Sequence, residues 1–460
     1  MGPSDGGLVP RLGVADTLRV ALGVVAPTLA QGVIARRPRA MALAERFDLD
    51  GRAVTTVQQL HRRHGDGLVR LALPRRVALV LGADDVHEVL GDSPEPFALA
   101  NREKQGALSQ FQPHGVLASH GRAREERRAV NETVLDTPRP VHRLAPAIVT
   151  AVREEAREVA AHAARGGHLD WSSFSAGWRR VVRRVVLGDA ARDDEALQAD
   201  LDALRYRGNW SYLLPRDRTR RDRFRGRLSG YLERAEPGSL AGLLATTAGD
   251  DAEVDPVDQI PQWLFAFDPA GMATIRALAL LTADLQEGAR ARAELADTDL
   301  DAPQELRRLR AAVLESVRLW PTTPMILRET TRDTEWAGAR LPAGTAVAVY
   351  APFFHRDDDT LDAAHRFDPA LWLGDGPAGD ARTTWPLVPF SEGPGVCPGQ
   401  NLVLLTASTF LATLLEHHEH ERVHPRRLDP TRLPGVISPF RVRFRTTSRV
   451  VSSGAPGRLS

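Results

Sequence analysis

The sequence contains almost no cysteine and almost no lysine. Its one cysteine, Cys397, excludes an intramolecular disulfide and any metal site built from several cysteines, and it fits a reducing cytoplasm. The 460 residues include 60 basic and 59 acidic ones, so a net charge of +1 leaves no overall field that would draw the protein to nucleic acid or acidic lipid. Lys104 is the one lysine, and arginine carries the remaining positive charge. The single cysteine predicts a cytoplasmic protein, and the near-zero net charge predicts one that does not bind nucleic acid.

The N-terminal segment also lacks the features of a secretion signal or a membrane span. It has no charged start followed by a small-residue cleavage site. The apolar stretch over residues 18–34 contains Pro27 and Gln31, whereas about 20 clean apolar residues are needed to cross a bilayer. We therefore expect residues 1–40 to form an amphipathic arm that docks on the protein. Peripheral contact of this arm with a membrane is the disfavoured alternative.

Helical spacing of apolar residues dominates the middle of the chain. The predicted helices cover residues 147–164, 178–187, 194–204 and 220–232. No internal repeat or low-complexity linker divides the chain, which favours one large domain. Short extended runs are predicted at a hairpin and two further strands, over residues 68–73, 77–81, 346–350 and 440–444. These patterns predict a mainly α fold with a small β-rich lobe.

Two further helices can be placed with their ends. Residues 258–285 are apolar on nearly every face, which predicts a helix through the centre of the protein. Pro269 lacks a backbone N–H and should interrupt this helix with a kink. The second helix is expected to begin near Asp301, a favourable N-cap with Pro303 in the first turn, and to end before Pro321.

The strongest motif surrounds the single cysteine. Residues 390–399 read FSEGPGVCPG and precede an apolar helical pattern. Glycines and prolines on both sides of a cysteine predict a tight loop whose backbone approaches a flat object closely. The following helix N-terminus should lower the pKa of the thiol and favour the thiolate that an axial haem ligand needs. A buried inert cysteine is the alternative, and it leaves the glycines unexplained.

This segment resembles the cysteine loop of the cytochrome P450 haem-thiolate monooxygenases, F-x-x-G-x-R/H-x-C-x-G. Four positions match: Phe390, Gly393, Cys397 and Gly399. The resemblance implies that Cys397 ligates the iron of haem b and that the other three positions bind the cofactor. Gly395 stands where the family usually has Arg or His to hold a haem propionate, so that charge-assisted hydrogen bond is missing or is supplied from elsewhere.

A second motif, Glu315-x-x-Arg318, resembles the family's E-x-x-R. At this spacing the carboxylate and the guanidinium share one helix face and can form a bidentate bridge. Such a pair is common on solvated helices, and its place in order before Cys397 favours the family interpretation. Arg366 falls where the family supplies a second arginine, so the resemblance implies a structural triad of Glu315, Arg318 and Arg366.

Three cationic residues resemble the family's contacts to the haem propionates. His120 and Arg124 match its H/W-x-x-x-R pattern, four residues apart on one helix face, and Arg328 sits where many members place a propionate-binding arginine. The resemblance implies that all three bind the cofactor. A solvated, arginine-rich helix face is the alternative for the first two.

The central helix carries a stretch, AGMAT over residues 270–274, that resembles the family's A/G-G-x-D/E-T. The resemblance implies a catalytic role for Ala270, for Gly271, which would make room for dioxygen, and for Thr274, which would donate a hydrogen bond to it. The family's acid is absent, because Ala273 stands in its place, so proton delivery falls to water or another side chain. An ordinary buried helix with a proline kink is the alternative.

The substrate pocket is assigned by position in the same family. Its implied walls are largely apolar, which indicates an apolar small molecule such as a terpenoid or another specialised metabolite. Residues 110–116 are expected in a mobile entrance loop. The implied walls are Phe267, Thr323, Met325, Ile326, Ile437 and Phe440.

The resemblance covers roughly residues 80–445 and implies a single-domain cytochrome P450 fold. The expected divisions are an N-terminal arm over residues 1–40, a haem-thiolate domain over 41–446 and a C-terminal tail over 447–460. The resemblance implies a soluble bacterial monooxygenase that uses O2 and works as a monomer. It would receive electrons from a separate ferredoxin or flavodoxin with an NAD(P)H-dependent reductase.

Two other functions stay open. One is a haem-thiolate enzyme for desaturation, radical coupling or peroxide-driven oxidation, which the alanine at position 273 motivates. The other is a non-catalytic haem-binding sensor, against which Thr274 argues. Two competing clusters, a His420/His424 pair that could hold a metal ion and the basic residues 216–227, are more simply solvated helix surface.

Overall fold

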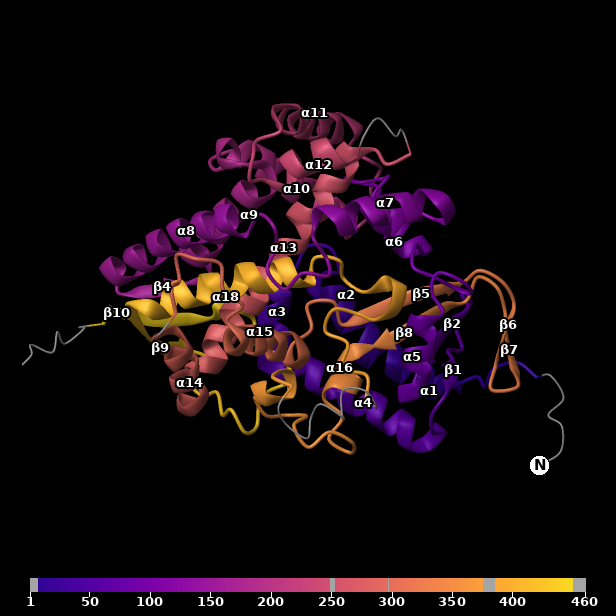
Figure 1. Ribbon diagram of the computed structural model, residues 1–460. Helices are drawn as coiled ribbons and strands as arrows, with labels where there is room; N and C mark the ends of the chain where they lie inside the picture. Colours follow the sequence, from indigo (N-terminus) through magenta and orange to yellow (C-terminus); the bar gives the residue numbers. More distant parts are fainter. Residues whose placement is uncertain (1–6, 249–252, 297, 375–384, 450–460) are drawn as a thin grey trace, which may run out of the picture.

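Helices form the body of the protein, most of the strands gather in a smaller region at one side, and a separate three-stranded sheet lies at the opposite side (Figure 1). The computed structural model describes residues 7–248, 253–296, 298–374 and 385–449. The mainly α fold with a small β-rich lobe is therefore confirmed. Part of the predicted arm, residues 1–6, and most of the predicted tail, residues 450–460, lie outside the described residues.

The helices and strands follow in chain order. The helices are α1 (Val14–Val20), η1 (Ala21–Val25), α2 (Ala26–Gln31), α3 (Pro38–Phe47), α4 (Leu49–His64), α5 (Ala83–Gly91), α6 (Arg102–Leu108), η2 (Val116–Ala118), α7 (Gly121–Val134), α8 (Ala145–Gly166), α9 (Trp171–Leu187), η3 (Asp189–Ala191), α10 (Glu195–Gly208), α11 (Arg218–Arg234), α12 (Leu240–Thr247), α13 (Pro256–Leu281), α14 (Leu285–Ala296), α15 (Arg307–Leu319), α16 (Ala351–His355), η4 (Pro369–Trp372), η5 (Gly393–Gly395), α18 (Gln400–Glu416) and η6 (Pro439–Arg441). The strands are β1 (Leu68–Arg70), β2 (Val77–Val80), β3 (Phe97–Ala98), β4 (His168–Asp170), β5 (Met325–Thr330), β6 (Thr334–Trp336), β7 (Ala339–Leu341), β8 (Ala346–Tyr350), β9 (His418–His424) and β10 (Arg443–Ser448).

The largest sheet has five strands in the order β1-β2-β8-β5-β3. The predicted hairpin is present as antiparallel β1 and β2, and β8 lies between β2 and β5. The strand predicted over residues 440–444 is only partly correct. Pro439 opens the short helix η6 because its fixed φ suits a helical start, and the strand β10 begins at Arg443.

The four helices predicted in the middle of the chain are all present as α8, α9, α10 and α11, with ends that differ by a few residues. The largest difference is at α9, which begins seven residues before the predicted start. Asp170 caps this helix by accepting a hydrogen bond from the Ser173 backbone N–H at 3.0 Å. In return, the Asp170 backbone N–H donates to the Ser173 hydroxyl oxygen at 3.2 Å. The cap therefore adds two turns to the predicted helix.

The long helix α13 runs through the centre of the protein, as predicted, and packs against α9, α15 and α18 (Figure 1). It continues through both Pro261 and Pro269, so the expected interruption does not end it. Within the described part of the chain, α13 is also the helix long and apolar enough to cross a membrane, and 78% of its most apolar window is buried inside the protein. Its apolar surface thus serves the core.

The helix α15 begins at Arg307, six residues after the predicted N-cap. Asp301 does not cap it, because its carboxylate accepts hydrogen bonds from Arg153 and Arg157 at 2.7 Å each. The chain instead turns into the helix at Leu306, whose φ is 44°. The end of the helix before Pro321 is confirmed.

Candidate cofactor site

Cys397 lies in the loop between η5 and α18. Its backbone N–H donates to Phe390 O at 2.9 Å, and the Val396 N–H donates to Gly393 O at 3.0 Å, so the loop closes on itself. Gly393 has a left-handed φ of 62°, and a Cβ there would collide with the backbone carbonyl of Leu90 on α5. The close packing of α5 against the loop therefore requires this glycine.

Burial and the surrounding groups act in opposite directions on the pKa of the Cys397 thiol. Burial raises the pKa of the Cys397 thiol, and a hydrogen bond from the Gly399 N–H and the charge of Arg128 oppose this only in part. The predicted lowering by the helix N-terminus is thus outweighed by desolvation. A metal ion bound to the sulfur deprotonates a thiol outright, so the thiolate form calls for a cation.

Three cationic side chains from distant parts of the chain meet near this loop. They are Lys104 of α6, Arg124 of α7 and Arg328 of β5. Burial, together with the charges of Arg328 and Arg124, lowers the pKa of Lys104 to about 7. Burial and the charge of Arg124 lower the pKa of Arg328 to about 10. Such shifts arise where cations are brought together without enough opposite charge.

The N–H groups of these cations donate to uncharged oxygens. Arg328 Nε donates to Ser93 Oγ at 2.9 Å, and Lys104 Nζ donates to Leu99 O at 2.7 Å. Two buried nitrogens, Arg328 Nη2 and Arg124 Nε, have no acceptor among the described residues. Buried polar groups nearly always have a partner, so these donors indicate a place that receives an anionic group.

Gly395 explains how Arg328 reaches this place. A Cβ at position 395 would lie 2.5 Å from Arg328 Nη2. Where the family usually has Arg or His, this chain has a glycine that leaves room for the guanidinium of Arg328. Lys104 adds a second positive charge beside Arg328. Lys104 was not among the predicted site residues, and the available signal was that it is the one lysine of the chain.

His120 is the exposed N-cap residue of α7, and its Nε2 lies 2.9 Å from the side-chain nitrogen of Gln105, the residue after Lys104. The structure brings together Arg124 and Arg328 and adds Lys104 to them, whereas the role of His120 stays a prediction.

The Glu315–Arg318 pair is fully buried on α15. Nε and Nη2 of Arg318 donate to the two carboxylate oxygens at 2.6 and 2.7 Å, and both side chains are 0% exposed. Arg318 also donates to the backbone carbonyl oxygens of His355 at 2.9 Å and Arg366 at 2.8 Å. The bidentate bridge expected from the spacing is formed, and it holds two distant segments of backbone.

The predicted triad is corrected by the position of Arg366. Its side chain is 48% exposed and pairs with Asp368 at 3.1 Å, so only its backbone carbonyl reaches Arg318. Glu315 accepts instead from the Trp372 indole N–H at 2.7 Å and from the Asp368 backbone N–H at 2.9 Å. The carboxylate is satisfied without a second arginine, because these two neutral donors already occupy it.

His355 connects α15 to the cysteine loop. Burial and the charge of Arg318 lower the pKa of His355 to about 3, so its ring is neutral. Its Nε2 accepts a hydrogen bond from the Val388 N–H at 3.0 Å, which leaves Nδ1, 3.2 Å from Arg318 O, as the donor. The buried ion pair thereby holds the chain two residues before Phe390.

On α13, Ala270 and Thr274 lie one helical turn apart on one face. Thr274 Oγ1 donates to Ala270 O at 2.8 Å, so the hydroxyl hydrogen is engaged by the helix itself. Gly271 faces elsewhere, because a Cβ there would lie 2.8 Å from the ring of Trp178 on α9. The prediction that Gly271 makes room for dioxygen is therefore corrected: the glycine makes room for Trp178.

Two of the predicted pocket walls are aromatic rings in contact with tryptophans. Phe267 is a core residue, 2% exposed, and its ring centroid lies 6.4 Å from that of Trp178, because it precedes Gly271 by one turn and shares its face. Phe440 is half-buried and packs edge-on against Trp171, with centroids 5.3 Å apart. Their role as pocket walls stays a prediction.

The remaining predicted walls differ in exposure. Thr323 is exposed, Met325 and Ile326 are half-buried on β5, and Ile437 is buried. Ile326 shares a strand face with Arg328, two residues later.

The predicted entrance loop, residues 110–116, is hydrogen-bonded to the start of α13. The His114 backbone N–H donates to Asp258 at 2.9 Å, and its Nδ1 lies 2.6 Å from Asp255. These three side chains are close enough to hold a metal ion, but Arg225 already donates to Asp255 at 2.6 Å and Asp258 at 2.5 Å. The cluster therefore fastens the loop to α13 and α11.

The other histidine pair, His420 and His424, lies on the strand β9 rather than on a helix end. His420 is buried, with Nε2 3.0 Å from Leu414 O and Nδ1 3.0 Å from Thr446 Oγ1. Both ring nitrogens are thus engaged, and the helix spacing on which the metal interpretation depended is absent.

Comparisons with known proteins agree on one family. The family model "Cytochrome P450" matches residues 283–439. Cyclooctat-9-en-7-ol 5-monooxygenase of Streptomyces melanosporofaciens is 33% identical over 208 residues, 43% of each chain. Pentalenene oxygenase of Streptomyces avermitilis is 31% identical over 137 residues, 30% of each chain. The chain thus matches these relatives over less than half of their length.

Solved structures match over most of the chain. The crystal structure of the cytochrome P450 CYP102L1 has a TM-score of 0.70 at 18% identity and covers 97% of this chain and 100% of that one. The retinoic acid-bound cyanobacterial CYP120A1 has a TM-score of 0.69 at 18% identity and covers 85% and 93%. These matches confirm the single-domain fold. The family model over residues 283–439, the relatives and the fold all support membership of the cytochrome P450 superfamily.

Proposed function

We propose that the protein is a haem-thiolate monooxygenase that uses O2 to hydroxylate or otherwise oxidise an apolar small molecule. Haem is the cofactor of this family. The residues present fit it, because Cys397 offers a sulfur in a tight loop and the two unpartnered donors of Arg124 and Arg328 suit carboxylates. The observation that carries the proposal is the meeting of three cations near this loop, with no carboxylate paired to them in the part of the chain that the structure describes.

When bound through Cys397, haem supplies the activation of O2. The residues around it bind and orient: Arg328 Nη2, Arg124 Nε and the Lys104 ammonium are placed to receive the propionates. Phe390, Gly393 and Gly399 shape the loop that holds the sulfur.

Thr274 is proposed to orient protons at the oxygen-binding side. Its hydroxyl donates to Ala270 O, so its oxygen is left to accept a hydrogen bond from a water or another proton-bearing group. Ala273 holds no proton, and the nearby Asp268 accepts a hydrogen bond from Arg205. Proton delivery is therefore assigned to water held by Thr274.

The proposed substrate is an apolar specialised metabolite such as a terpenoid. Two relatives are named for cyclooctat-9-en-7-ol and pentalenene. Met325 and Ile326, two of the pocket walls predicted by position in the family, are apolar and half-buried, which suits such a molecule.

The setting proposed for the enzyme is a bacterial cytoplasm, where it works as a monomer. Electrons come from a separate ferredoxin or flavodoxin and its NAD(P)H-dependent reductase. The division into an arm over residues 1–40, a haem domain over 41–446 and a tail over 447–460 stays a prediction.

The first test is a difference spectrum of the reduced, carbon monoxide-bound protein. We expect a Soret band at the red-shifted position of thiolate ligation, lost in Cys397→Ser and kept in Ser175→Ala, a remote control on α9. A protein that takes up no haem would overturn the proposal, and a band typical of histidine ligation would assign the iron to another residue.

The second test separates oxygen-driven from peroxide-driven chemistry. The missing acid at position 273 favours peroxide-driven oxidation, desaturation or radical coupling as the second candidate function. Once a compound shifts the spin state, its turnover is measured with a ferredoxin, a reductase and catalase. Product formed under these conditions supports the monooxygenase. Product formed only with added peroxide contradicts it, and binding without any product indicates a sensor.

A further inference from the structure

A small cavity lies where the N-terminal arm meets α13 and two loops, one that follows α15 and one that precedes η6. Its volume is about 20 Å³, and about 10–15 Å³ is enough to hold a water molecule, so it has room for one oxygen-sized group. Thr322 and Val436 line it from the two loops. Each is next in sequence to a predicted pocket wall, Thr323 or Ile437, so the cavity lies beside the predicted substrate pocket.

Three charged side chains from separate elements line this cavity. They are Arg36, which follows α2, Asp50 at the start of α4 and Arg276 of α13. Arg276 is buried, and the other two are half-buried. Among the described residues, the Asp50 carboxylate accepts a hydrogen bond from Gln31 Nε2 at 2.7 Å but forms no ion pair. The three charges therefore surround the cavity without neutralising each other directly.

The two arginines hold the loops through backbone carbonyl oxygens. Arg276 donates from Nε and Nη2 to Ile437 O, at 3.1 and 2.7 Å, and from Nη1 to Trp320 O at 3.2 Å. Arg36 Nη2 donates to Thr322 O. A guanidinium has more N–H donors than these contacts use, and a carbonyl oxygen does not neutralise its charge. The arginines thus fix the walls of the cavity and keep donors for a further group.

The pKa values indicate that the three charges share one buried environment. Burial raises the pKa of Asp50, while the hydrogen bond from Gln31 and the charges of the two arginines oppose the shift. Burial and the charge of Arg36 lower the pKa of Arg276 to about 9, against the charge of Asp50. A buried charge is costly unless it is paired and hydrogen-bonded, so these groups favour a bound partner that offers hydrogen bonds.

A hydroxyl group is the partner that matches this set of side chains. It donates one hydrogen bond, which Asp50 can accept, and it accepts others, which Arg36 and Arg276 can donate. A ketone oxygen only accepts and would leave Asp50 without a donor, whereas a carboxylate would be repelled by Asp50. We propose that the cavity binds a hydroxyl group of the substrate, so that the enzyme oxidises an apolar molecule that is already an alcohol.

This proposal rests on the proposed oxidation of an apolar small molecule and narrows its substrate class. In a mainly apolar pocket, a few placed polar groups fix the orientation of the ligand. Arg36, Asp50 and Arg276 thereby act as positioning residues, because they determine which carbon of the skeleton is turned away from the cavity. The preceding reaction must form an alcohol, by hydroxylating a hydrocarbon or by adding water to an alkene.

The test uses sets of apolar compounds in which one skeleton is a hydrocarbon, an alcohol and a ketone. The sets are menthane, menthol and menthone; decalin, decalol and decalone; and cholestane, cholestanol and cholestanone. Isothermal calorimetry with the purified full chain measures binding without turnover. We expect the alcohol of at least one set to bind at least about tenfold more tightly than its hydrocarbon and its ketone, since only the alcohol satisfies both kinds of side chain.

The acceptor of the cavity is tested by substitution. Asp50→Leu should weaken binding of that alcohol by about tenfold and leave binding of the hydrocarbon unchanged, whereas Asp50→Asn keeps an acceptor oxygen and should retain most of the preference. The matched control Asp16→Leu removes a carboxylate of α1 that pairs with Arg19 and Arg63 and does not line the cavity. It should bind all three compounds like the unmodified protein.

Thermal unfolding establishes that each variant is folded. If Asp50→Leu does not fold, Arg36→Met, which removes a half-buried donor, takes its place with the same expected loss. The proposal is overturned if no alcohol binds more tightly than its hydrocarbon and ketone, or if the variant keeps the full preference; the cavity then holds water alone. A preference for the alcohol in a protein that forms no product with O2 and electrons would support the cavity and contradict the oxidation. Product from a hydrocarbon without any preference for its alcohol would do the reverse.

Discussion

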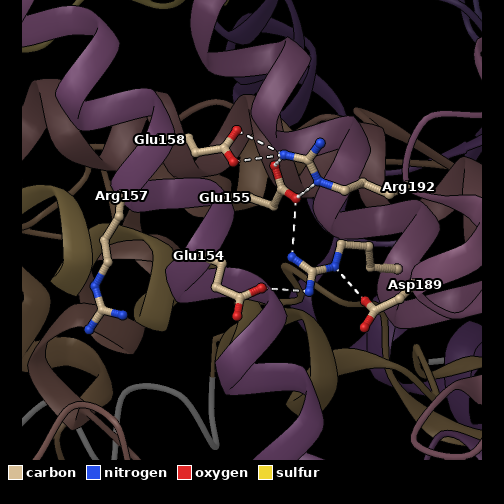
Figure 2. Close-up of a pocket in the computed structure, with 7 residues that line it drawn as sticks. Glu154, Glu155, Arg157, Glu158, Asp189 and Arg192 are labelled. Atoms are coloured by element: carbon tan, nitrogen blue, oxygen red, sulfur yellow. Dashed lines mark hydrogen bonds and ion pairs between the residues drawn. The ribbon is translucent and has the colours of Figure 1, made fainter.

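Arginine is the main cation of this protein, and two clusters of cations are built in opposite ways. Where α8 and α9 meet, Glu155 and Glu158 face Arg192, and Arg184 joins them (Figure 2). Each arginine that lines this place pairs with a carboxylate. Near the Cys397 loop, in contrast, three cations meet, and none of them has an ion-pair partner among the residues that the structure describes. The first cluster is complete by itself, whereas the described residues supply no anion to the second.

The pKa values express the same difference. Burial alone would raise the pKa of Glu155, but hydrogen bonds from Arg192 and Arg180 outweigh it and hold the pKa below its usual value. Lys104 has no such partner, and burial beside two arginines lowers its pKa to about 7. The paired cluster surrounds a surface cavity of about 530 Å³, yet its charges are already neutralised. Unpaired charge is therefore a better guide to a binding site here than the size of a cavity.

Pairing should matter most where water is excluded, which is at Glu315. We expect Glu315→Gln to lower the free energy of unfolding by about 3–5 kcal/mol, because Arg318 is then left as an uncompensated buried charge. Denaturant unfolding measures this. As a control, Glu421→Gln removes one partner of an exposed pair with Arg445 and should cost less than about 1 kcal/mol. Equal losses would show that burial does not control the value of a pair.

The paired cluster is tested at its centre and at its edge. Glu155, 1% exposed, bonds to three arginines, and we expect Glu155→Gln to cost about 2–3 kcal/mol of unfolding free energy. Glu158 is 58% exposed, so we expect Glu158→Gln to lower the free energy of unfolding by less than about 1 kcal/mol. Both are read from denaturant midpoints. A larger loss at Glu158 would contradict the view that the cluster is a closed structural network.

The unpaired cluster should respond in the opposite way. We expect Arg328→Gln to release haem about tenfold faster, since a charge-assisted hydrogen bond is lost, and to leave the apoprotein as stable as before. Transfer of haem to an acceptor protein measures the release rate. The control Arg192→Gln should destabilise the protein without changing haem release. A destabilised Arg328→Gln apoprotein with unchanged haem release would mean that the cations serve the fold alone.

The most gradual effect is expected from pH, through Lys104. Its pKa is about 7 in the folded protein and near 10.4 in the unfolded chain, so the unfolded state binds more protons between these values. The destabilisation is therefore fully present below about pH 7, and the apoprotein should gain stability from pH 7 to 10 by less than about 1.4 kcal/mol per pH unit. Thermal midpoints across this range should rise in the apoprotein and stay flatter in Lys104→Met. If the thermal midpoint rose equally with pH in both proteins, Lys104 would not be the group that causes the rise.

The motifs recognisable in the sequence were those that depend on neighbours along the chain. The spacing of Glu315 and Arg318 within one helical turn already placed their side chains on one face. The glycines around Cys397 already indicated a tight loop. The mainly α fold and the central α13 followed from the apolar spacing for the same reason.

Contacts between distant segments could not be foreseen in this way. Trp372 rather than Arg366 binds Glu315, and Trp178 rather than dioxygen occupies the space at Gly271, because both outcomes depend on how separate elements pack. Lys104 reaches Arg328 only through the meeting of α6 and β5.

The sequence by itself determined the helices, the cysteine loop and the pairing of Glu315 with Arg318, since spacing along one element sets which side chains share a face. The tertiary structure decided which cations lack a partner and which apolar residues stay exposed. Burial and neutralisation are properties of the packed chain, because they depend on which elements approach each other and exclude water.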